Sequence, residues 1–150
     1  MEILLHYIWK HRMFPLREMT TTGGDTVEVI DPGLHNSNAG PDFFNAKIKI
    51  GGMLWVGNVE IHSKASDWFL HGHDNDPAYD NVILHVVGES DTAVRTSRGD
   101  TVRQMQMDVP DSVKQNYRLL LHEDRFPPCH SIVPKLSKLT IHSWMSALQA

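Results

Sequence analysis

The sequence predicts a mixed α/β fold, in which a central sheet with strands of both orientations is flanked by helices. Two apolar strands around Gly51-Gly52 predict an antiparallel hairpin with a two-residue connection. The continuous apolar run over residues 82–87 is typical of a strand buried on both faces at a sheet centre. A helical segment at residues 64–73 lies between the hairpin and this apolar run. A helix between strands of one sheet favours a mixed sheet that is covered by helices. The alternative is an all-β sandwich with peripheral helices, although sandwich strands usually alternate.

Composition narrows the class of protein before any motif is considered. The 150 residues suit one compact domain. The net charge of -4 argues against a protein that coats nucleic acid by bulk electrostatics. A single cysteine, Cys129, excludes an internal disulfide framework and fits a reducing compartment. No stretch approaches the ~18 apolar residues of a membrane span, and the N-terminus lacks the order of a signal peptide. We therefore expect a cytoplasmic protein with no membrane partner.

In the first half of the chain, patterns typical of helices and strands alternate with residues typical of turns. Apolar residues at helical spacing predict a helix over residues 2–13, which Pro15 ends. A short strand follows over residues 26–30, and residues 34–41 read as a polar loop. The hairpin strands are expected at residues 43–50 and 53–63, with a bulge at Gly57-Asn58.

The second half is predicted in the same way. After the helix at residues 64–73 and the buried strand at 82–87, residues 92–109 read as a second hairpin. A helix capped by Asp111 is expected over residues 111–122. We expect an α/β domain over residues 1–125, followed over residues 126–150 by a proline-rich connector and the start of a helix. That helix has no stop signal, so we expect the natural protein to continue beyond it.

One pair of acids carries the functional prediction. Asp42 opens the first hairpin strand and Glu60 lies towards the end of the second, and these two ends face each other in an antiparallel hairpin. Two carboxylates forced together repel unless a cation lies between them or one is protonated. Oxygen ligands favour Mg²⁺ or Mn²⁺. Glu60 and His62 share a strand face, which Lys64 joins if the strand persists, so either side chain can assist a metal-bound water.

The order helix–strand–strand–strand–helix–strand, with Pro41-Asp42 on one strand and Glu60-x-His62 on the next, resembles the PD-(D/E)XK nuclease superfamily. The resemblance covers residues 2–87 and implies a restriction-endonuclease-like core. It also implies metal-dependent cleavage of DNA or RNA, with Asp42 and Glu60 as magnesium ligands. His62 stands where that family has a catalytic lysine, so His62 or Lys64 takes this place, or catalysis is lost. Glu2 matches a further acidic position of the family.

A second resemblance spans most of the chain. The segments at residues 40–46, 57–62, 66–68 and 79–87 are similar to an uncharacterised bacterial domain-of-unknown-function family. This resemblance implies membership of a family and brings no activity with it.

Several alternatives stay open. Pro41-Asp42 can be a turn before a strand, and Glu60 can pair with Lys47 or Lys49. A nuclease-like fold without activity could serve as a binding or assembly domain. His71 and His73, with His62, form a candidate zinc site, which is the less favoured metal prediction. His85 lies in an apolar run, where a core histidine is expected, although it could reach Glu60 from a neighbouring strand.

Overall fold

The structure is a computed structural model that describes residues 1–14, 18–121 and 137. The chain divides into two compact units, Met1–Asp108 and Val109–Ala150. In the second unit the structure describes one helix, α3 (Asp111–Leu121), which begins at the residue predicted to cap it. The predicted boundary at residue 125, the connector with Cys129 and the helix beyond Ser137 lie outside the described residues. No helix in the described part of the chain has the length and apolar content needed to cross a bilayer.

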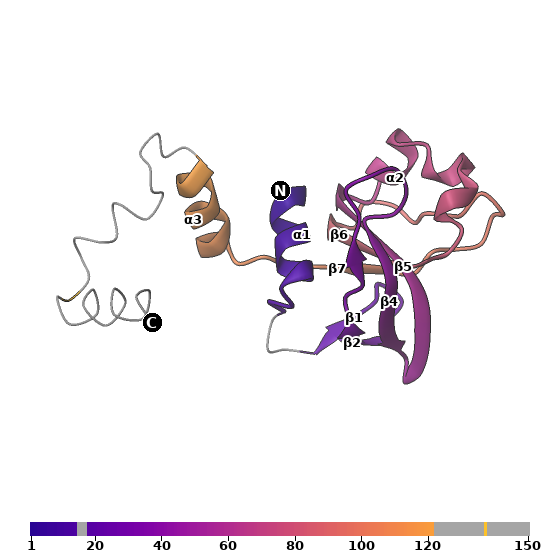
Figure 1. The fold of residues 1–150 in the computed structure, drawn as a ribbon, viewed down its shortest axis with the longest axis horizontal. Coiled ribbons are helices and arrows are strands. Elements are labelled where there is room, and N and C mark those ends of the chain that lie inside the picture. Colours follow the sequence, from indigo (N-terminus) through magenta and orange to yellow (C-terminus); the bar gives the residue numbers. More distant parts are fainter. Residues whose placement is uncertain (15–17, 122–136, 138–150) are drawn as a thin grey trace, which may run out of the picture. The chain divides into compact units, whose positions relative to one another are not determined.

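A seven-stranded mixed sheet is the centre of the first unit (Figure 1). Its strand order is β1-β2-β4-β5-β6-β7, and β3 pairs with β4 beside this path. The early strands pair antiparallel, whereas β6 pairs parallel with both β5 and β7. The mixed sheet is confirmed and the sandwich alternative is wrong. The strands are β1 (Met19–Thr20), β2 (Thr26–Asp31), β3 (Leu34–His35), β4 (Phe43–Ile50), β5 (Met53–Lys64), β6 (Val82–Glu89) and β7 (Gln104–Gln106).

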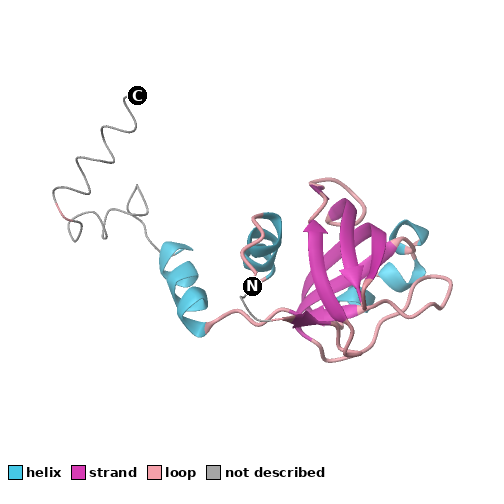
Figure 2. Ribbon diagram, turned by 90° about the horizontal axis from the view of Figure 1, so that it is seen from below, coloured by secondary structure: helices cyan, strands magenta, loops and turns pink. Residues whose placement is uncertain are grey.

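Helices cover the two faces of the sheet. In Figure 2, α1 (Glu2–Lys10) lies on one side of the sheet, and α2 (Asp67–Leu70) lies on the other side with two 3₁₀ turns, His73–Asn75 and Pro77–Tyr79. Each of these two helices contributes one fully buried tryptophan, Trp9 from α1 and Trp68 from α2. Trp9 donates from its indole nitrogen to the carbonyl of Pro32 (3.0 Å), and Trp68 donates to that of Arg95 (3.0 Å). Each indole therefore ties its helix to a distant segment while it fills the core.

The hairpin has the predicted two-residue turn, because Ile50 pairs with Met53. Beside the position predicted for a bulge, Gly57-Asn58, the register of β5 against β6 shifts between Asn58 and Val59. A second bulge was not predicted. Between Phe43 and Ala46 the register shifts against β5, and the extra residue belongs to β4, where Asn45 has a φ of 55°. Phe43 and Ala46 are both fully buried although three positions separate them. Asparagine tolerates this left-handed conformation better than most side chains, which explains why the bulge occurs there.

The ends of two predicted helices differ from the structure. The helix predicted over residues 2–13 stops at Lys10, because Arg12 has a φ of 54° and its guanidinium donates to the carbonyl of Val29 (2.9 Å). The helix predicted over residues 64–73 shrinks to the four residues of α2. There β5 continues to Lys64, which pairs with Glu89 of β6, and Gly72 interrupts the helix with a φ of 75°.

A predicted loop and a predicted hairpin differ from the structure, because a local sequence pattern does not identify the partner of a strand. The predicted loop at residues 34–41 begins with β3, which pairs with Phe43 and Phe44. The predicted hairpin over residues 92–109 contains only one isolated bridge, Arg95 to Thr101. Its distal residues instead form β7, parallel to β6.

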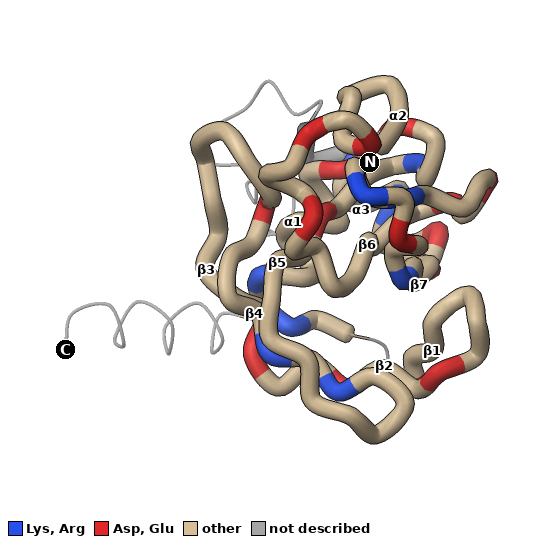
Figure 3. The backbone as a smooth tube through the Cα atoms, turned by 90° about the vertical axis from the view of Figure 1, so that its right-hand side faces the viewer, with Lys and Arg blue, Asp and Glu red and all other residues tan. Residues whose placement is uncertain are grey.

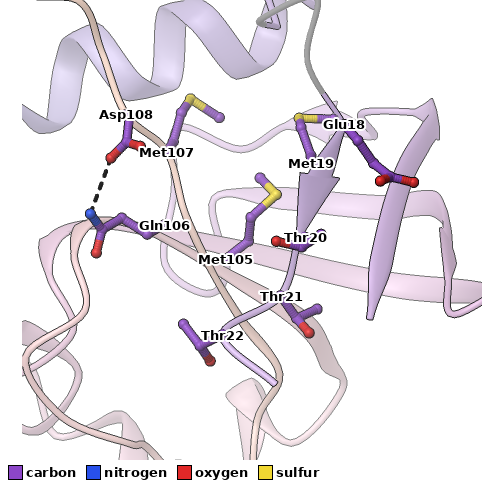
Figure 4. A pocket seen from close by; sticks show the side chains of 9 residues that line it. All are labelled: Glu18, Met19, Thr20, Thr21, Thr22, Met105, Gln106, Met107 and Asp108. Atoms are coloured by element: carbon purple, nitrogen blue, oxygen red, sulfur yellow. Dashed lines mark hydrogen bonds between the residues drawn. The ribbon is translucent and has the colours of Figure 1, made fainter. Parts of the chain in front are cut away.

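The two ends of the sheet approach each other. The amide of Thr22, just after β1, donates to the carbonyl of Gln104 at the start of β7 (2.8 Å). A cavity of about 360 Å³ lies along this contact, lined mainly by threonines of the β1 segment and methionines of the β7 segment (Figure 4). The sheet of the first unit is therefore strongly curved.

Candidate functional site

The loop before β4 is organised to present Asp42. Asn36 donates from its side-chain amide to the carbonyls of Asn38, Ala39 and Pro41 (3.0–3.1 Å). The backbone amide of Asn36 donates to the carbonyl of Asp42 (2.7 Å). One asparagine thus satisfies the backbone of a six-residue turn, and the position of Asp42 follows from that turn.

The bulge at Asn45 decides which residue of β5 stands beside Asp42. From the turn, Ile50 pairs with Met53, and the unbroken register would set residue 42 opposite Ile61. The bulge shifts the register so that Phe43 pairs with Val59, and the next step sets Asp42 opposite Glu60. Directly opposite residues of an antiparallel pair share a sheet face. The bulge therefore accounts for the meeting of the two acids, which the unbroken hairpin would not give.

Backbone amides hold the carboxylates of both Asp42 and Glu60. The amide of Asp42 donates to Glu60 Oε2 (3.0 Å), and the amide of Ile61 donates to Asp42 Oδ2 (2.9 Å). Glu60 is only 5% exposed. Burial raises the pKa of Glu60, and the charge of Asp42 raises it further, against a lowering by His73. A cation placed at these carboxylates would relieve that electrostatic cost.

His6 reaches the same place from α1. Its Nε2 atom lies 3.2 Å from Asp42 Oδ2, although the geometry is not that of a hydrogen bond. Burial alone would lower the pKa of His6, but Asp42 outweighs it, with a contribution from Glu2 one helical turn earlier, and the net shift is upward. Glu2, the further acid of the nuclease-like pattern, therefore acts on the site through the charge of His6.

Three histidines gather on the other side of Glu60. One ring nitrogen from each of His62, His71 and His73 lies within 4.8 Å of the others. His62 Nε2 is 3.1 Å from His71 Nδ1, and His73 Nε2 is 3.2 Å from Glu60 Oε1. His62 and His73 are buried, whereas His71 is exposed. The cluster is therefore open to solvent at one ligand only.

A chain of contacts behind the cluster orients His62. In the parallel register of β5 and β6, His85 stands beside Glu60. His85 Nε2 lies 2.8 Å from His62 Nδ1, and His85 Nδ1 lies 3.3 Å from Gln104 Oε1. Burial, reinforced by the neighbouring histidines, lowers the pKa of His62 to about 2, and burial lowers that of His85 to about 4. Both rings are therefore neutral near pH 7.

Aromatic side chains close the cluster towards the core. The ring of His73 stacks on Tyr79 with centroids 3.7 Å apart, and Trp68 meets both His73 and His85 edge-on or tilted. Burial raises the pKa of Tyr79 to about 12, so the phenol stays neutral beside the histidines. Trp68 and Tyr79 belong to one apolar cluster that extends below the site.

Lys64 points elsewhere. Its ammonium lies 3.2 Å from Glu89, and both side chains are more than half exposed. Lys47 and Lys49, the other partners considered for Glu60, stand instead opposite Asp31 and Glu28 of β2. Figure 3 shows basic and acidic positions close together around β4. The structure thus brings Asp42, Glu60 and His62 together and leaves these three lysines apart from them.

Sequence reasoning missed His6 and Gln104 and only touched on His85. His6 lies on a helix that sequence alone does not dock. Gln104 was assigned to a hairpin strand with no link to His85. Pairing residues 82–87 in parallel with the second hairpin strand would have placed His85 next to Glu60.

The cavity beside β1 and β7 is a different place. Its lining includes Glu18 and Asp108, of which Asp108 accepts from Gln106 (3.1 Å), and none of the clustered histidines (Figure 4). The chemistry-bearing side chains of the described residues therefore concentrate at the histidine cluster and not in this cavity.

A family model described as a protein of unknown function, DUF2851, matches residues 2–150. No curated protein and no solved structure matches the chain.

Proposed function

Since the chain belongs to the DUF2851 family, whose function is unknown, we propose a function from the geometry of the site. The function is hydrolysis of phosphodiester bonds in DNA or RNA, with a divalent ion, Mg²⁺ or Mn²⁺, held by Asp42 and Glu60. The observation that carries this proposal is the mutual approach of the two acids across the hairpin, with Asp42 N–H on Glu60 Oε2 at 3.0 Å.

The topology supports the same proposal. The elements α1, β2, β4, β5, α2 and β6 follow in that order, with β4 antiparallel to its neighbours and β6 parallel to β5. This is the element order on which the likeness to the PD-(D/E)XK core rests. Asp42 precedes β4 and Glu60 lies within β5, the positions of the two metal ligands in that resemblance.

The chemistry follows from the residues that surround the acids. A bound divalent ion polarises a phosphoryl oxygen and lowers the pKa of a bound water. His62 is neutral, so it cannot replace the positive charge of the lysine found at its place in the resembled family. His6, whose pKa is raised beside Asp42, is the nearby group able to carry positive charge. We assign to His6 the stabilisation of developing charge on the phosphate.

The test is a cleavage assay on duplex DNA, single-stranded DNA and RNA, with Mg²⁺ or Mn²⁺ and with chelator. We expect metal-dependent cleavage by the wild type. Asp42→Asn and Glu60→Gln should each lose more than the roughly 10–100-fold that removal of an outer-shell partner costs. Glu89→Gln, an exposed acid paired with Lys64, is the matched control and should keep its activity. Equal cleavage by the wild type and Glu60→Gln would refute the proposal.

One observation favours a second candidate, a nuclease-like binding domain without catalysis. The lysine position holds a neutral, buried histidine, and the nearest lysine along the strand pairs with Glu89 instead. This candidate predicts that labelled DNA or RNA is bound and stays intact with every divalent ion tested. Cleavage that depends on Glu60 would exclude it.

A further inference from the structure

We propose that His62, His71 and His73, together with Glu60, form a binding site for a transition-metal ion, and that Zn²⁺ is its occupant. The proposal does not rest on phosphodiester hydrolysis. It concerns three histidine ligands that the hydrolytic proposal does not use as metal ligands, with Glu60 as the one ligand common to both ions, and it is tested without nucleic acid.

The spacing of the ligand atoms is the first support. Zinc bonds of about 2.0–2.1 Å in a tetrahedral arrangement set the ligand atoms roughly 3.3 Å apart. The observed separations are 3.1 Å for His62 Nε2 to His71 Nδ1, 3.2 Å for His73 Nε2 to Glu60 Oε1, and 3.5 Å for His62 Nε2 to Glu60 Oε1. Three of the six separations among these four atoms thus match the distance that one ion requires, and the three histidine nitrogens all lie within 4.8 Å of one another.

The second support is the tautomer that the protein imposes on His62. Gln104 donates from Nε2 to the carbonyl of Thr92 (2.9 Å), which leaves Oε1 to face His85 as an acceptor. His85 Nδ1 therefore carries its proton, and its Nε2 accepts from His62 Nδ1 (2.8 Å). His62 Nε2 is then left without a proton. Its lone pair points into the cluster, as a metal-binding imidazole requires.

The third support is a buried nitrogen without a hydrogen-bond partner. His73 Nε2 lies 3.2 Å from Glu60 Oε1 but makes no hydrogen bond with any of the described residues. Buried polar atoms are rarely left unpaired. A cation at the centre of the cluster would give His73 Nε2 its missing partner and would lie beside the negative charge of Glu60.

The local backbone is shaped for the cluster. Gly72 separates the two loop histidines and has a φ of 75°, and it directly precedes the 3₁₀ turn that begins at His73. His73 is fixed by stacking on Tyr79, whereas His71 is exposed and offers a route for the ion. Rigid ligands on a strand and a turn, with one accessible ligand, form a preorganised site.

The ligand types select the ion. Imidazole suits zinc and other transition metals, whereas magnesium prefers oxygen ligands. Glu60 Oε2 accepts the amide of Asp42 and Oε1 faces the imidazoles. A carboxylate offers about four lone-pair sites, so Glu60 can serve this centre and the ion proposed between Asp42 and Glu60.

The experiment is a titration of the full chain with Zn²⁺, after removal of metal by a chelator, in competition with a chromophoric chelator. Co²⁺ is the spectroscopic probe, because its visible absorption reports nitrogen ligands and coordination number. We expect one equivalent of Zn²⁺, and a Co²⁺ spectrum of a four-coordinate site with imidazole ligands. His71→Ala and His73→Ala should each weaken binding by more than the roughly 10–100-fold of an outer-shell change.

His11→Ala removes an exposed histidine outside the cluster and is the matched control, which should bind as the wild type does. Circular dichroism verifies the fold of each variant. If His73→Ala unfolds, the exposed His71 decides alone. Binding of no Zn²⁺ by the wild type, or unchanged binding by His71→Ala, would overturn the zinc centre. Magnesium-dependent cleavage by a chain that binds no zinc overturns this centre and leaves the hydrolytic proposal intact.

Discussion

Gln104 contacts two parts of the molecule. Its backbone carbonyl accepts from the amide of Thr22, and its side chain lies between Thr92 and His85. Its amide nitrogen donates to Ser90 Oγ (3.2 Å) and to the carbonyl of Thr92 (2.9 Å), while its oxygen faces His85. It is only 4% exposed, so each of these groups is shielded from water. The orientation of the His85 and His62 rings therefore depends on a residue that belongs to neither β5 nor β6.

Replacing Gln104 with Leu should allow the neutral ring of His62 to carry its proton on either nitrogen, because His85 is no longer oriented by Gln104. We expect the affinity for Zn²⁺ to fall by about 10–100-fold, as for other outer-shell partners. We also expect a loss of about 1–3 kcal/mol in the free energy of unfolding, because buried groups lose their partners. Zinc titration and chemical denaturation measure the two effects.

The ¹⁵N shifts of the histidine rings separate orientation from stability in this variant. A loss of stability with unchanged His62 and His85 tautomers would contradict the role assigned to Gln104. Gln106→Leu changes the same residue type at an exposed position of β7 and serves as the control.

Asp80 gives a prediction about pH. Burial alone would raise its pKa, but hydrogen bonds from Ser97 (2.9–3.0 Å) and Arg98 (2.9 Å) outweigh this, and the pKa is lowered. A carboxylate with a lowered folded pKa contributes stability above its unfolded pKa of about 4, and that contribution is lost as the pH falls through the folded value. The stability difference between wild type and Asp80→Asn should therefore be constant from pH 6 to 8 and shrink below about pH 4.

Urea denaturation at a series of pH values measures this difference. Glu28→Gln, which removes the same charge from a side chain that is two-thirds exposed, is the control and should show little effect at any pH. A constant difference between wild type and Asp80→Asn down to pH 2 would contradict the assigned hydrogen bonds.

At the scale of elements, the bulge in β4 is the feature on which the site depends most. Asn45 has a φ of 55°, which costs a β-branched residue about 1–2 kcal/mol more than glycine. We expect Asn45→Val to lower the free energy of unfolding by about that amount and Asn45→Gly to leave it within a few tenths. Thermal unfolding of the matched pair measures the difference.

The same pair also tests the register. If Asn45→Val is as stable as Asn45→Gly, the extra residue is not at position 45. Deletion of Asn45 should restore the unbroken register and separate Asp42 from Glu60, which amide exchange at Ile61 would reveal, because that amide donates to Asp42 Oδ2.

The elements that could be predicted from sequence are those whose signals are local. The Gly51-Gly52 turn and the apolar run over residues 82–87 identified the hairpin and β6 almost to their ends. The bulge at Asn45 and the strand β7 were missed, because neither a single asparagine within a strand nor an alternating pattern identifies the partner strand and its register. The same limit applies to the site. Asp42 and Glu60 were linked through one hairpin, whereas His6 and Gln104 reach it through tertiary packing that no spacing encodes.

At the scale of the whole molecule, a bound ion should act as a stabilising ligand of the first unit. The ligands His62 and Glu60 lie on β5, and His71 and His73 lie in the loop that leads towards β6. An ion that binds only the folded chain stabilises it by about 2.7 kcal/mol at one hundred times its dissociation constant. We expect Zn²⁺ to raise the melting temperature of the wild type and to leave that of His71→Ala unchanged, as measured by calorimetry. An equal rise in both would contradict the assigned ligands.

The approach of the first and last strands of the curved sheet has a consequence for solubility. Exposed strand edges recruit further chains and seed fibrils. Here the Thr22 amide meets the Gln104 carbonyl, so part of each terminal edge is already occupied within the same chain. We therefore expect this intramolecular contact to leave less of the edge for another copy to extend, and to lower the tendency of the first unit to aggregate edge to edge.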